Sequence, residues 1–251
     1  KRTSNIKLKG GNKIYKNNLD KVNLISANYN IDKNLLLSLM GIETNFGTYL
    51  GKMDIISSLA TLSFDKRRSE FFTSELITLL KLIDNNVVNS ENLYGSWAGA
   101  FGNFQFMPST IKNYAVDSNN DGRINLKETE DSFASAANYL NSLGWDNKKP
   151  CFYKIELKKN IPNSYLNISA KKIHSTKKVK YLKKYIQNFN FLDKYDNLNA
   201  AIITPDAEIV ENPDRLSPGY IIFDNYKLIL KWNRSLRFGL AVCTLKEKFS
   251  N

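Results

Sequence analysis

Hydrophobic residues recur at helical spacing through most of the first 145 residues and again near the end of the chain. The clearest pattern predicts a helix within residues 30–47. Asn30 or Asp32 can cap its beginning, and Gly47 marks its end. Its apolar face is formed by Leu35, Leu36, Leu39 and Met40. One face of this helix is therefore expected to be buried.

Further helices are predicted on the same criterion. They are expected around residues 19–25, 54–62, 64–82, 131–143 and 226–249. Pro108 is expected at the start of another helix, because its missing N–H and fixed φ suit the first helical position. Gly144 is expected to end the helix that precedes it.

After residue 145 the pattern changes to short apolar runs separated by Pro, Asn and Asp, which is typical of β-strands. The runs are residues 152–157, 200–203 and 220–223. The stretch 171–184 between them is expected to be part helix and part loop. The sequence therefore predicts an α+β fold. A mainly helical domain is expected at residues 1–146 and 226–251, with a small lysine-rich, β-containing domain at residues 147–225.

Composition and charge narrow the class of protein. The chain has 251 residues, of which 42% are hydrophobic, so a sizeable core is available. The net charge is +12, and the stretch 148–194 alone holds 13 lysines against two acids, Glu156 and Asp193. This stretch is either a solvated surface or a site of attraction to an anionic polymer or membrane surface. Nucleic acid is not an expected partner, because the stretch has no arginine and no recognition motif accompanies it.

The apolar pattern of the sequence contains no targeting signal, and cysteine and histidine are few. No apolar run approaches the roughly 18 residues of a membrane span, and the first residues contain no secretory hydrophobic region. The protein is expected either to stay inside the cell or to have lost a leader. Cys151 and Cys243 are too few for a paired-cysteine metal site and form either a disulfide or two buried thiols. The single histidine, His174, supports neither a histidine-based triad nor a zinc site.

Glu43 stands at the C-terminal end of the apolar stripe of the helix at residues 30–47. A carboxyl group there is expected to be partly desolvated. Desolvation raises a carboxyl pKa and keeps the group protonated near neutral pH, which is the state that a general acid needs. The alternative is an ordinary glutamate in the last turn of a helix.

Residues 94–109 form an unusual stretch, Tyr-Gly-Ser-Trp-Ala-Gly-Ala-Phe-Gly-Asn-Phe-Gln-Phe-Met-Pro-Ser. Glycines let a backbone approach a ligand closely, and aromatic faces stack on the apolar faces of sugar rings. Ser96, Asn103 and Gln105 are expected to orient hydroxyl or amide groups of such a ligand. The alternative is a tightly packed core loop.

Residues 117–128 match the pattern of a calcium-binding loop of the EF-hand kind. Gly122 provides the sharp turn of this loop. The expected ligands are Asp117, Asn119, Asp121, the carbonyl of Arg123, Asn125 and Glu128. One such loop without a second one beside it favours a structural ion over a sensor. The alternative is an Asn/Asp/Gly turn that binds no ion.

Four motifs follow one another in a distinctive order. They are Gly-Ile-Glu-Thr-Asn-Phe-Gly at 41–47, Leu-Ala-Thr-Leu-Ser-Phe at 59–64 followed by Arg67 and Arg68, the glycine-rich stretch at 95–109, and the start of the calcium-type loop at 117–122. Asn138-Tyr139, Gly144-Trp145 and Asn233-Arg234-Ser235 fit the same order. With these motifs the chain resembles bacterial lytic murein transglycosylases of the membrane-bound type B family, over about residues 20–246.

The resemblance implies a lysozyme-like catalytic domain that cuts the β-1,4 bond between N-acetylmuramic acid and N-acetylglucosamine without water and leaves a 1,6-anhydro ring. A hydrolytic glycosidase uses two carboxylates, and neither cleft-forming motif holds a second one. Glu43 would first protonate the leaving oxygen and then, as a carboxylate, accept the proton of the sugar's own 6-hydroxyl. The substrate's N-acetyl group would stabilise the developing positive charge.

The resemblance also implies roles for substrate-binding residues. Ser96, Gln105 and Asn233 would hold acetamido and hydroxyl groups, Arg67 or Arg68 would face carboxylates of the peptide or lactyl group, and Tyr139 would line the sugar subsites. Where the family often has tyrosines, this chain has Phe71, Trp232 and Phe238, which keep ring stacking but lose hydroxyl hydrogen bonds. Many relatives close the calcium loop a few residues later, so Asp131 competes with Glu128 as the last ligand.

The expected partners are peptidoglycan glycan strands and, through the lysine-rich stretch, anionic wall polymer or a membrane surface. The same resemblance implies one structural Ca²⁺ and no organic cofactor. It also implies a monomer in the periplasm or cell envelope. Two other functions compete with the transglycosylase. A hydrolytic muramidase would leave a reducing end, and a non-catalytic, calcium-stabilised peptidoglycan-binding protein would leave the glycan intact.

Overall fold

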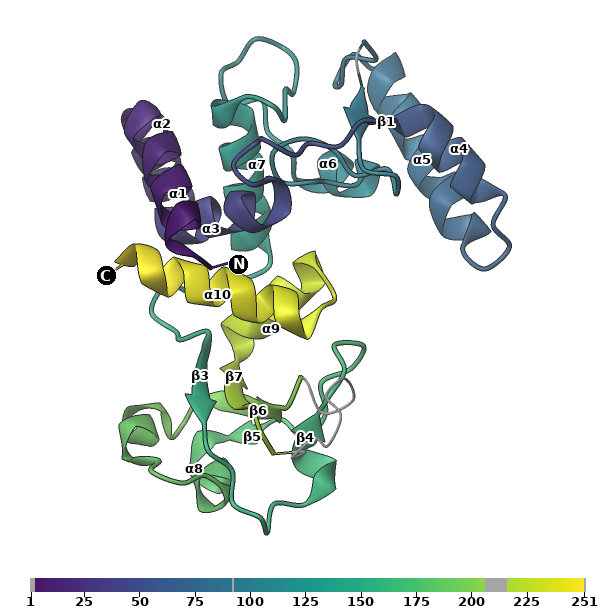
Figure 1. Ribbon diagram of the computed structural model, residues 1–251. Helices are drawn as coiled ribbons and strands as arrows, with labels where there is room; N and C mark the ends of the chain where they lie inside the picture. Colours follow the sequence, from purple (N-terminus) through teal and green to yellow (C-terminus); the bar gives the residue numbers. More distant parts are fainter. Residues whose placement is uncertain (1–2, 92, 206–215, 251) are drawn as a thin grey trace. The chain divides into compact units, whose positions relative to one another are not determined.

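The computed structural model describes residues 3–91, 93–205 and 216–250 of the chain. The chain forms two compact units (Figure 1). The first consists of Lys1–Gly144 with Leu245–Asn251, and the second of Trp145–Thr244. Helices dominate and a small sheet accompanies them, which confirms the predicted α+β class. The predicted assignment of residues 226–251 to the helical domain stays a prediction.

Helices make up most of the first unit. Their bounds are α1 Asn5–Asn17, α2 Leu19–Tyr29, α3 Lys33–Thr44, α4 Ile55–Ser63, α5 Ser69–Asp84, α6 Pro108–Tyr114 and α7 Thr129–Ser142. Two short strands, β1 Met53–Asp54 and β2 Tyr94–Gly95, pair antiparallel in the same unit. Pro108 occupies the predicted position at the start of α6.

Helix α3 is buried on nearly every side. The carboxylate of Asp32 accepts a hydrogen bond of 2.9 Å from the N–H of Asn34 and so caps the beginning of the helix. Asn30, the other candidate, instead ends α2 in a left-handed conformation with φ 52°. Residues 35–41 are all buried, including Ser38. The predicted apolar face is therefore confirmed, and burial extends beyond it.

The N-terminal helix α1 was not predicted. Gly11 is its one buried residue, and a Cβ at that position would lie 2.2 Å from the ring of Phe249. The packing face of α1 is thus formed by small residues that let aromatic rings approach closely. A search for apolar stripes cannot detect such a face.

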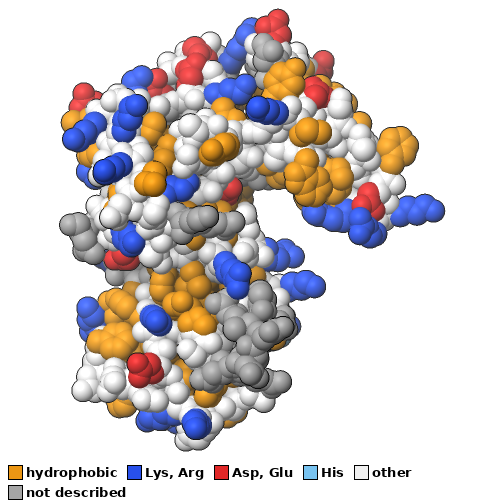
Figure 2. Space-filling model, viewed as in Figure 1, with side chains coloured by type: hydrophobic (Ala, Val, Ile, Leu, Met, Phe, Trp, Pro, Cys, Tyr) orange, Lys and Arg blue, Asp and Glu red, His pale blue; other side chains and the backbone are white. Residues whose placement is uncertain are grey.

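Strand β1 leads directly into α4, which lies beside α5 (Figure 1). The carboxylate of Asp54 accepts a hydrogen bond of 2.7 Å from the N–H of Ser57 and caps α4. The turn between α4 and α5 is exposed, with Phe64 86% exposed. Figure 2 shows Lys and Arg side chains gathered at this end of the helix pair, next to hydrophobic side chains.

The second unit is built on a five-stranded sheet in the order β3-β7-β6-β4, with β5 paired to β6. The strands are β3 Phe152–Ile155, β4 Leu166–Asn167, β5 Lys177–Lys178, β6 Asn199–Ile203 and β7 Gly219–Phe223. All pairings are antiparallel except β4 with β6. The predicted β-containing region and its three predicted runs are confirmed. The lysine-rich stretch forms β5, helix α8 Val179–Leu182 and a 3₁₀ turn at Lys183–Tyr185, in agreement with the prediction.

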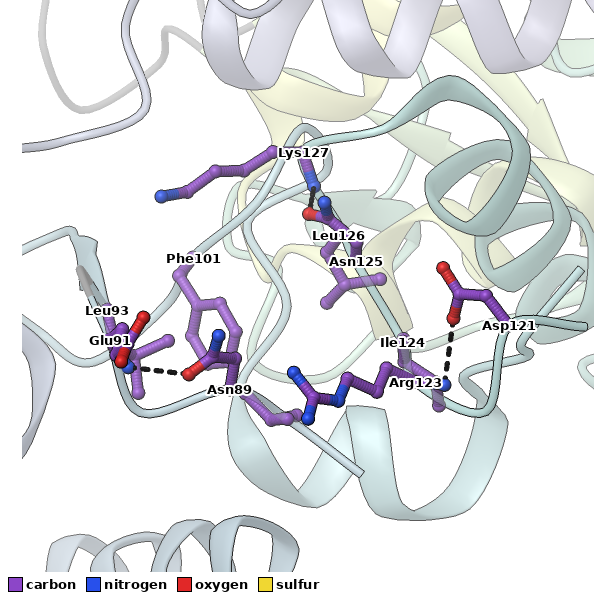
Figure 3. A pocket seen from close by; sticks show the side chains of 11 residues that line it. Asn89, Glu91, Leu93, Phe101, Asp121, Arg123, Ile124, Asn125, Leu126 and Lys127 are labelled. Carbon is purple, nitrogen blue, oxygen red and sulfur yellow. Dashed lines mark hydrogen bonds between the residues drawn. The ribbon is translucent and has the colours of Figure 1, made fainter. Parts of the chain in front are cut away.

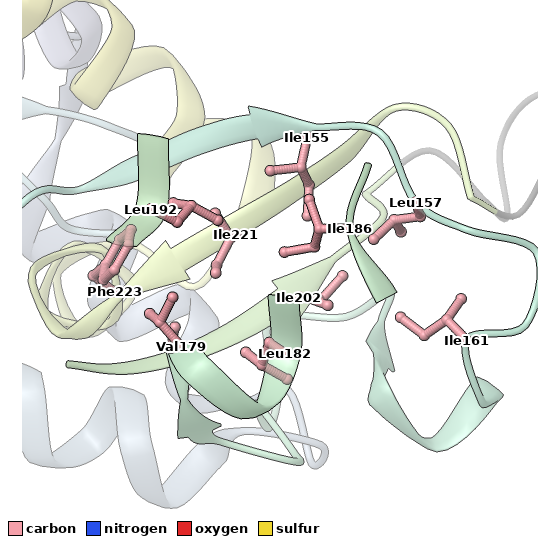
Figure 4. Close-up of a cluster of buried hydrophobic side chains, with 11 residues drawn as sticks. Ile155, Leu157, Ile161, Val179, Leu182, Ile186, Leu192, Ile202, Ile221 and Phe223 are labelled. Carbon is pink, nitrogen blue, oxygen red and sulfur yellow. The ribbon is translucent and has the colours of Figure 1, made fainter. Parts of the chain in front are cut away.

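Apolar side chains from the strands and from the lysine-rich stretch form one cluster (Figure 4). Ile202 and Ile221 contribute from the sheet, and Val179, Leu182 and Ile186 contribute from the segment that packs on it. These five side chains are at most 1% exposed. The lysine-rich stretch therefore carries lysines outward while its apolar residues build the core.

The chain leaves the second unit through helices α9 Asp224–Trp232 and α10 Leu236–Ser250. The hydroxyl of the fully buried Tyr226 donates a hydrogen bond of 2.5 Å to the carbonyl of Leu236. Burial raises the pKa of Tyr226 well above its ordinary value. A Cβ at Gly239 would lie 2.8 Å from the Tyr226 ring, so a glycine is needed where the two helices meet.

A disulfide joins Cys151, immediately before β3, to Cys243 in α10, with Cα atoms 6.2 Å apart. Both residues are buried. The structure thus decides between the disulfide and the two free thiols that the sequence left open. The bridge spans 92 residues of chain, which are most of the second unit.

We expect replacement of both cysteines, Cys151→Ala with Cys243→Ala, to lower the free energy of unfolding of the second unit by about 2–4 kcal/mol, because the open chain regains loop entropy. Chemical denaturation with and without a reductant measures this change. Reductant should destabilise the wild type and leave the double variant unaffected. Equal stability of the two proteins under oxidising conditions would show that the bridge contributes nothing.

Candidate active site

Glu43 lies in the last turn of α3 and is partly buried, in line with its predicted place at the end of the apolar stripe. The chain reverses immediately after it through three consecutive left-handed residues, Asn45, Phe46 and Gly47, with φ 52°, 60° and 78°. Asn and Gly adopt this conformation readily, whereas Phe does so at a cost in strain. The surrounding packing must therefore hold Phe46 in place.

Glycines supply that packing. A Cβ at Gly41 would lie 2.6 Å from the Phe46 ring, and one at Gly10 would lie 2.8 Å from it. The ammonium group of Lys7 donates a hydrogen bond to the carbonyl of Gly41 and lies 5.7 Å from the centre of the Phe46 ring. Helix α1 thus supports the end of α3 where Glu43 is presented.

The residue after Glu43 joins this helix to the glycine-rich loop. The Thr44 hydroxyl donates a hydrogen bond of 2.8 Å to the backbone carbonyl of Asn103 and accepts one of 3.1 Å from the N–H of Gly47. Thr44 is fully buried and Asn103 is 4% exposed. The two motifs that the sequence singled out are therefore in direct contact.

Asn103 was predicted to orient a ligand, and the structure corrects this. Its side-chain amide donates hydrogen bonds to the carbonyl of Lys127, at 3.0 Å, and to the hydroxyl of Ser132, at 3.1 Å. With its side chain buried and both amide hydrogens used inside the protein, Asn103 has a structural role. The phenylalanines of the loop are core residues as well. Phe101, Phe104 and Phe106 are 4%, 2% and 3% exposed.

Ser96 and Gln105 remain partly accessible on the same loop. The Ser96 hydroxyl accepts a hydrogen bond of 3.0 Å from the N–H of Ala100, which leaves its proton to be donated elsewhere. The side-chain amide of Gln105 donates to the carbonyls of Leu50, at 3.2 Å, and Gly102, at 3.0 Å. Gln105 thereby fastens the segment that follows Gly47 to the loop.

A groove of about 490 Å³ lies between β1, one side of α4 and the turn after β2. Its walls include three exposed hydrophobic side chains, Met53, Tyr94 and Trp97, which are 53%, 46% and 68% exposed. A Cβ at Gly99 would lie 2.3 Å from Leu59, so glycine lets this turn press against α4. Trp97 is exposed, whereas the three phenylalanines of the loop are buried, and the residue types alone do not predict this difference.

The two predicted arginines have different surroundings. Arg67 is 88% exposed and forms two hydrogen bonds with Asp65, at 3.1 and 2.7 Å. These bonds hold the pKa of Asp65 well below its usual range, at about 2. The guanidinium of Arg68 lies over the rings of Phe71 and Phe72, with its central carbon 4.5 and 4.8 Å from their centres. Phe71 is 41% exposed, so part of its ring remains accessible.

Tyr139 lies on α7, stacked on Tyr114 with ring centres 4.4 Å apart and edge-on to Phe106. Burial, together with the neighbouring Tyr114, raises the pKa of Tyr139. Asn233 and Phe238 belong to the second unit, and their part in substrate binding stays a prediction. Asn233 is exposed, whereas Phe238 is only 4% exposed, which leaves little of its ring for a sugar.

The calcium-type loop turns at Gly122, which has φ 88°. In the structure its carboxylates accept hydrogen bonds from the loop's own N–H groups. Asp117 accepts from Gly122 at 2.8 Å, and Asp121 accepts from Arg123 at 2.9 Å. Within the described ranges, no three His, Cys, Asp or Glu side chains gather closely enough to hold a metal ion. The donor set is nevertheless made of hard oxygen atoms, which fits Ca²⁺.

Glu128 and Asp131, the two candidates for the last ligand, differ in burial. Glu128 is exposed, and its carboxylate accepts a hydrogen bond of 2.7 Å from the side chain of Asn125. Asp131 is fully buried, and its two oxygens accept hydrogen bonds from the N–H groups of Ser118, at 2.8 Å, and Asn125, at 2.7 Å. Asp131 therefore ties the two arms of the loop together.

A second hollow of about 290 Å³ separates this loop from the segment before β2 (Figure 3). Its lining carries charges of both signs: Glu91 on the segment before β2, and Asp121, Arg123 and Lys127 on the loop. Hydrogen bonds within each wall, such as that between Asp121 and the N–H of Arg123, keep the two sides in shape. Across the described part of the chain, no helix combines the length and apolar character needed to span a membrane.

The chain is 44% identical over 118 residues to membrane-bound lytic murein transglycosylase B of Escherichia coli (strain K12), an alignment that covers 47% of this chain and 33% of the relative. The chain thus spans about a third of that relative's length. Its structure is similar to that of Pseudomonas aeruginosa SltB3 in complex with NAG-NAM-pentapeptide, with a TM-score of 0.86, 27% identity, and coverage of 100% of this chain and 65% of that one.

The structure is also similar to that of the Escherichia coli lytic transglycosylase Slt35 in complex with calcium, with a TM-score of 0.79 and 27% identity over 97% of this chain and 74% of that one. These likenesses confirm the predicted lysozyme-like α+β fold class. The model of the transglycosylase SLT domain family matches residues 1–247. Since that match takes in nearly the whole chain, the chain belongs to the transglycosylase SLT domain family.

Proposed function

We propose that this chain is a lytic transglycosylase that cleaves the β-1,4 bond between N-acetylmuramic acid and N-acetylglucosamine in peptidoglycan and leaves a 1,6-anhydromuramoyl product. The observation that carries the proposal is the 2.8 Å hydrogen bond between Thr44 and Asn103. It joins the helix that carries Glu43 in its last turn to the loop that carries Ser96 and Gln105. The family match and the relatives' names as lytic transglycosylases support the same activity.

Glu43 acts as the single general acid and base. A partly buried carboxyl at the rigid end of a buried helix can be protonated when substrate arrives and can donate its proton to the leaving glycosidic oxygen. The resulting carboxylate then accepts the proton of the 6-hydroxyl as that oxygen attacks the anomeric carbon. One residue thus serves both steps, and the substrate supplies its own nucleophile in place of water.

Ser96 and Gln105 orient the sugar next to Glu43. Ser96 accepts a hydrogen bond from the backbone, so its own proton is directed to a substrate oxygen. Gln105 uses its NH₂ group on two carbonyls, so its Oε1 is the atom that accepts a hydrogen bond from an acetamido N–H. Asn233 holds a further hydroxyl group. Tyr139 and Phe71 line the sugar subsites, and Arg67 or Arg68 faces substrate carboxylates.

The loop at residues 117–131 binds one structural Ca²⁺. The residues that would hold the ion are Asp117, Asn119, Asp121, the carbonyl of Arg123, Asn125 and either Glu128 or Asp131. Bound Ca²⁺ would neutralise these carboxylates and hold the loop in one conformation. The calcium complex of the related Slt35 supports this part of the proposal.

The protein works in the cell envelope, where its substrate lies. The Cys151–Cys243 disulfide supports this location, because such bonds persist in oxidising compartments. The exposed lysines of the second unit, among them Lys177, Lys178 and Lys180, attract anionic wall polymer or a membrane surface. No organic cofactor takes part, and the protein acts as a monomer.

We expect Glu43→Gln to reduce the release of anhydro-muropeptides from purified peptidoglycan by at least about 100-fold, because glutamine can neither donate nor accept the catalytic proton. Mass spectrometry of the released sugars measures the loss. Glu70→Gln, which alters an exposed glutamate on α5, serves as the matched control and should keep full activity. Reducing-end products from the wild type would indicate a hydrolytic muramidase, and intact glycan with tight binding would indicate a binding protein.

Calcium should raise the thermal stability of the wild type, because an ion that binds the folded state at about 100 times its dissociation constant adds about 2.7 kcal/mol. Asp121→Asn should weaken this stabilisation, whereas Asp20→Asn, an exposed site on α2, should leave it unchanged. Differential scanning calorimetry in chelator and in calcium provides the comparison. An identical calcium effect in the wild type and Asp121→Asn would place the ion elsewhere.

Binding to the anionic surface should depend on salt. Co-sedimentation with vesicles that contain anionic lipid should fall strongly between 50 and 500 mM salt, because screening shortens the reach of surface charges to a few ångströms. A variant with Lys177, Lys178 and Lys180 changed to Gln should bind less at low salt than a variant with three exposed lysines of the first unit, Lys9, Lys13 and Lys16, changed likewise. Equal loss in both variants would refute a specific role for the lysine-rich stretch.

A further inference from the structure

The Thr44 hydroxyl occupies a position that controls the end of α3. It lies one residue after Glu43, is fully buried, and so does not contact a substrate. Its proton is donated to the carbonyl of Asn103, at 2.8 Å, with the carbonyl of Met40 also within reach at 3.1 Å. The same oxygen accepts the N–H of Gly47 at 3.1 Å. Thr44 thus fixes both the reversal of the chain after Glu43 and the contact with the next element.

Asn103 carries this contact onward to the loop at residues 117–131. Its backbone N–H donates a hydrogen bond of 2.8 Å to the carbonyl of Leu126, and its side chain donates to the carbonyl of Lys127. Leu126 and Lys127 form one wall of the hollow in Figure 3. The side chain of Asn103 also reaches the hydroxyl of Ser132 in the first turn of α7. Asn103 is therefore bonded both to the end of the loop, at Leu126 and Lys127, and to the start of α7, at Ser132.

The loop in turn depends on Asp131. This fully buried carboxylate accepts hydrogen bonds from the N–H groups of Ser118 and Asn125, which lie on opposite arms of the loop. A hydrogen bond from a backbone N–H to a charged acceptor is stronger than one to a neutral acceptor. Loss of one of these bonds would loosen the arm that leads to Leu126 and Lys127.

We propose that Thr44 and Asn103 are positioning residues through which the order of the 117–131 loop sets the orientation of Glu43. A general acid must lie within hydrogen-bond reach of the atom that it protonates, and a displacement of about 1 Å can cost about 100-fold in rate. The inference rests on the proposed function only for the role of Glu43. The structural coupling itself is independent of that role and of any bound ion.

A double-mutant cycle of Thr44→Val and Asp131→Asn in the presence of a chelator tests the proposal. Valine keeps the shape of threonine without its hydroxyl, and asparagine keeps one of the two acceptor oxygens of Asp131. Each substitution alone should lower kcat by about 10-fold or more with little change in KM, since positioning rather than binding is lost. The double variant should lose clearly less than the product of the two single losses, because both act through one path.

Hydrogen exchange at the amides of Phe46 and Tyr49 gives a readout that needs no catalysis. These amides bond to the carbonyls of Met40 and Thr44, within the chain reversal. Asp131→Asn should speed their exchange in the wild-type background and should have no further effect in the Thr44→Val background. If wild-type protein proves inactive on peptidoglycan, the proposed function fails, and this exchange measurement still decides the coupling.

Ser38→Ala is the matched control, because it removes another buried hydroxyl of α3, which donates a hydrogen bond to the carbonyl of Asn34 within the same helix. In this background, Asp131→Asn should keep its full effect on both readouts. Should Asp131→Asn fail to fold by circular dichroism, Ser132→Ala replaces it, since that change removes the side-chain acceptor of Asn103. Losses in kcat that multiply, together with unchanged exchange at Phe46 and Tyr49, would overturn the proposal.

Discussion

The first unit depends on the burial of one helix, α3. Its residues 35–41 are buried all round, so each side of it must be covered by another element. Helices α1, α2 and α7 supply that cover. A helix held in this way has little freedom to shift, and the acid in its last turn shares this rigidity. The unit can therefore present a carboxyl group at a fixed place.

Rigidity of the helix does not by itself fix the chain that follows it. The reversal at residues 45–47 places a phenylalanine in the left-handed region, and glycines at positions 10 and 41 make room for its ring. The buried Thr44 hydroxyl and the Asn103 amide then add hydrogen bonds that have defined directions. Apolar packing excludes water from this junction, whereas the polar groups select one arrangement among those that packing permits.

Much of this architecture could be predicted from the order of residues. Leucines at helical spacing predicted α3, and short apolar runs separated by Pro, Asn and Asp after residue 145 predicted the sheet. Both signals are local in the sequence, so they can be read without the structure. The roles of Asn103 and of the loop phenylalanines could not be predicted. Their partners lie 24 to 59 residues away along the chain, and composition alone does not show which side of a loop faces the core. Helix α1 was missed for a related reason, since its contacts are made by glycine.

The disulfide between Cys151 and Cys243 has an evolutionary consequence. The second unit begins at Trp145 and ends at Thr244, and the bridge holds Cys151 and Cys243, near these two ends, with their Cα atoms 6.2 Å apart. A segment whose two ends are held together by a disulfide can vary independently of the rest of the chain. Residues can be added or deleted between the cysteines without changing the distance between the two points where the segment joins the flanking chain. The lysine-rich unit can thus diversify in length and surface while the helix that carries Glu43 keeps its sequence.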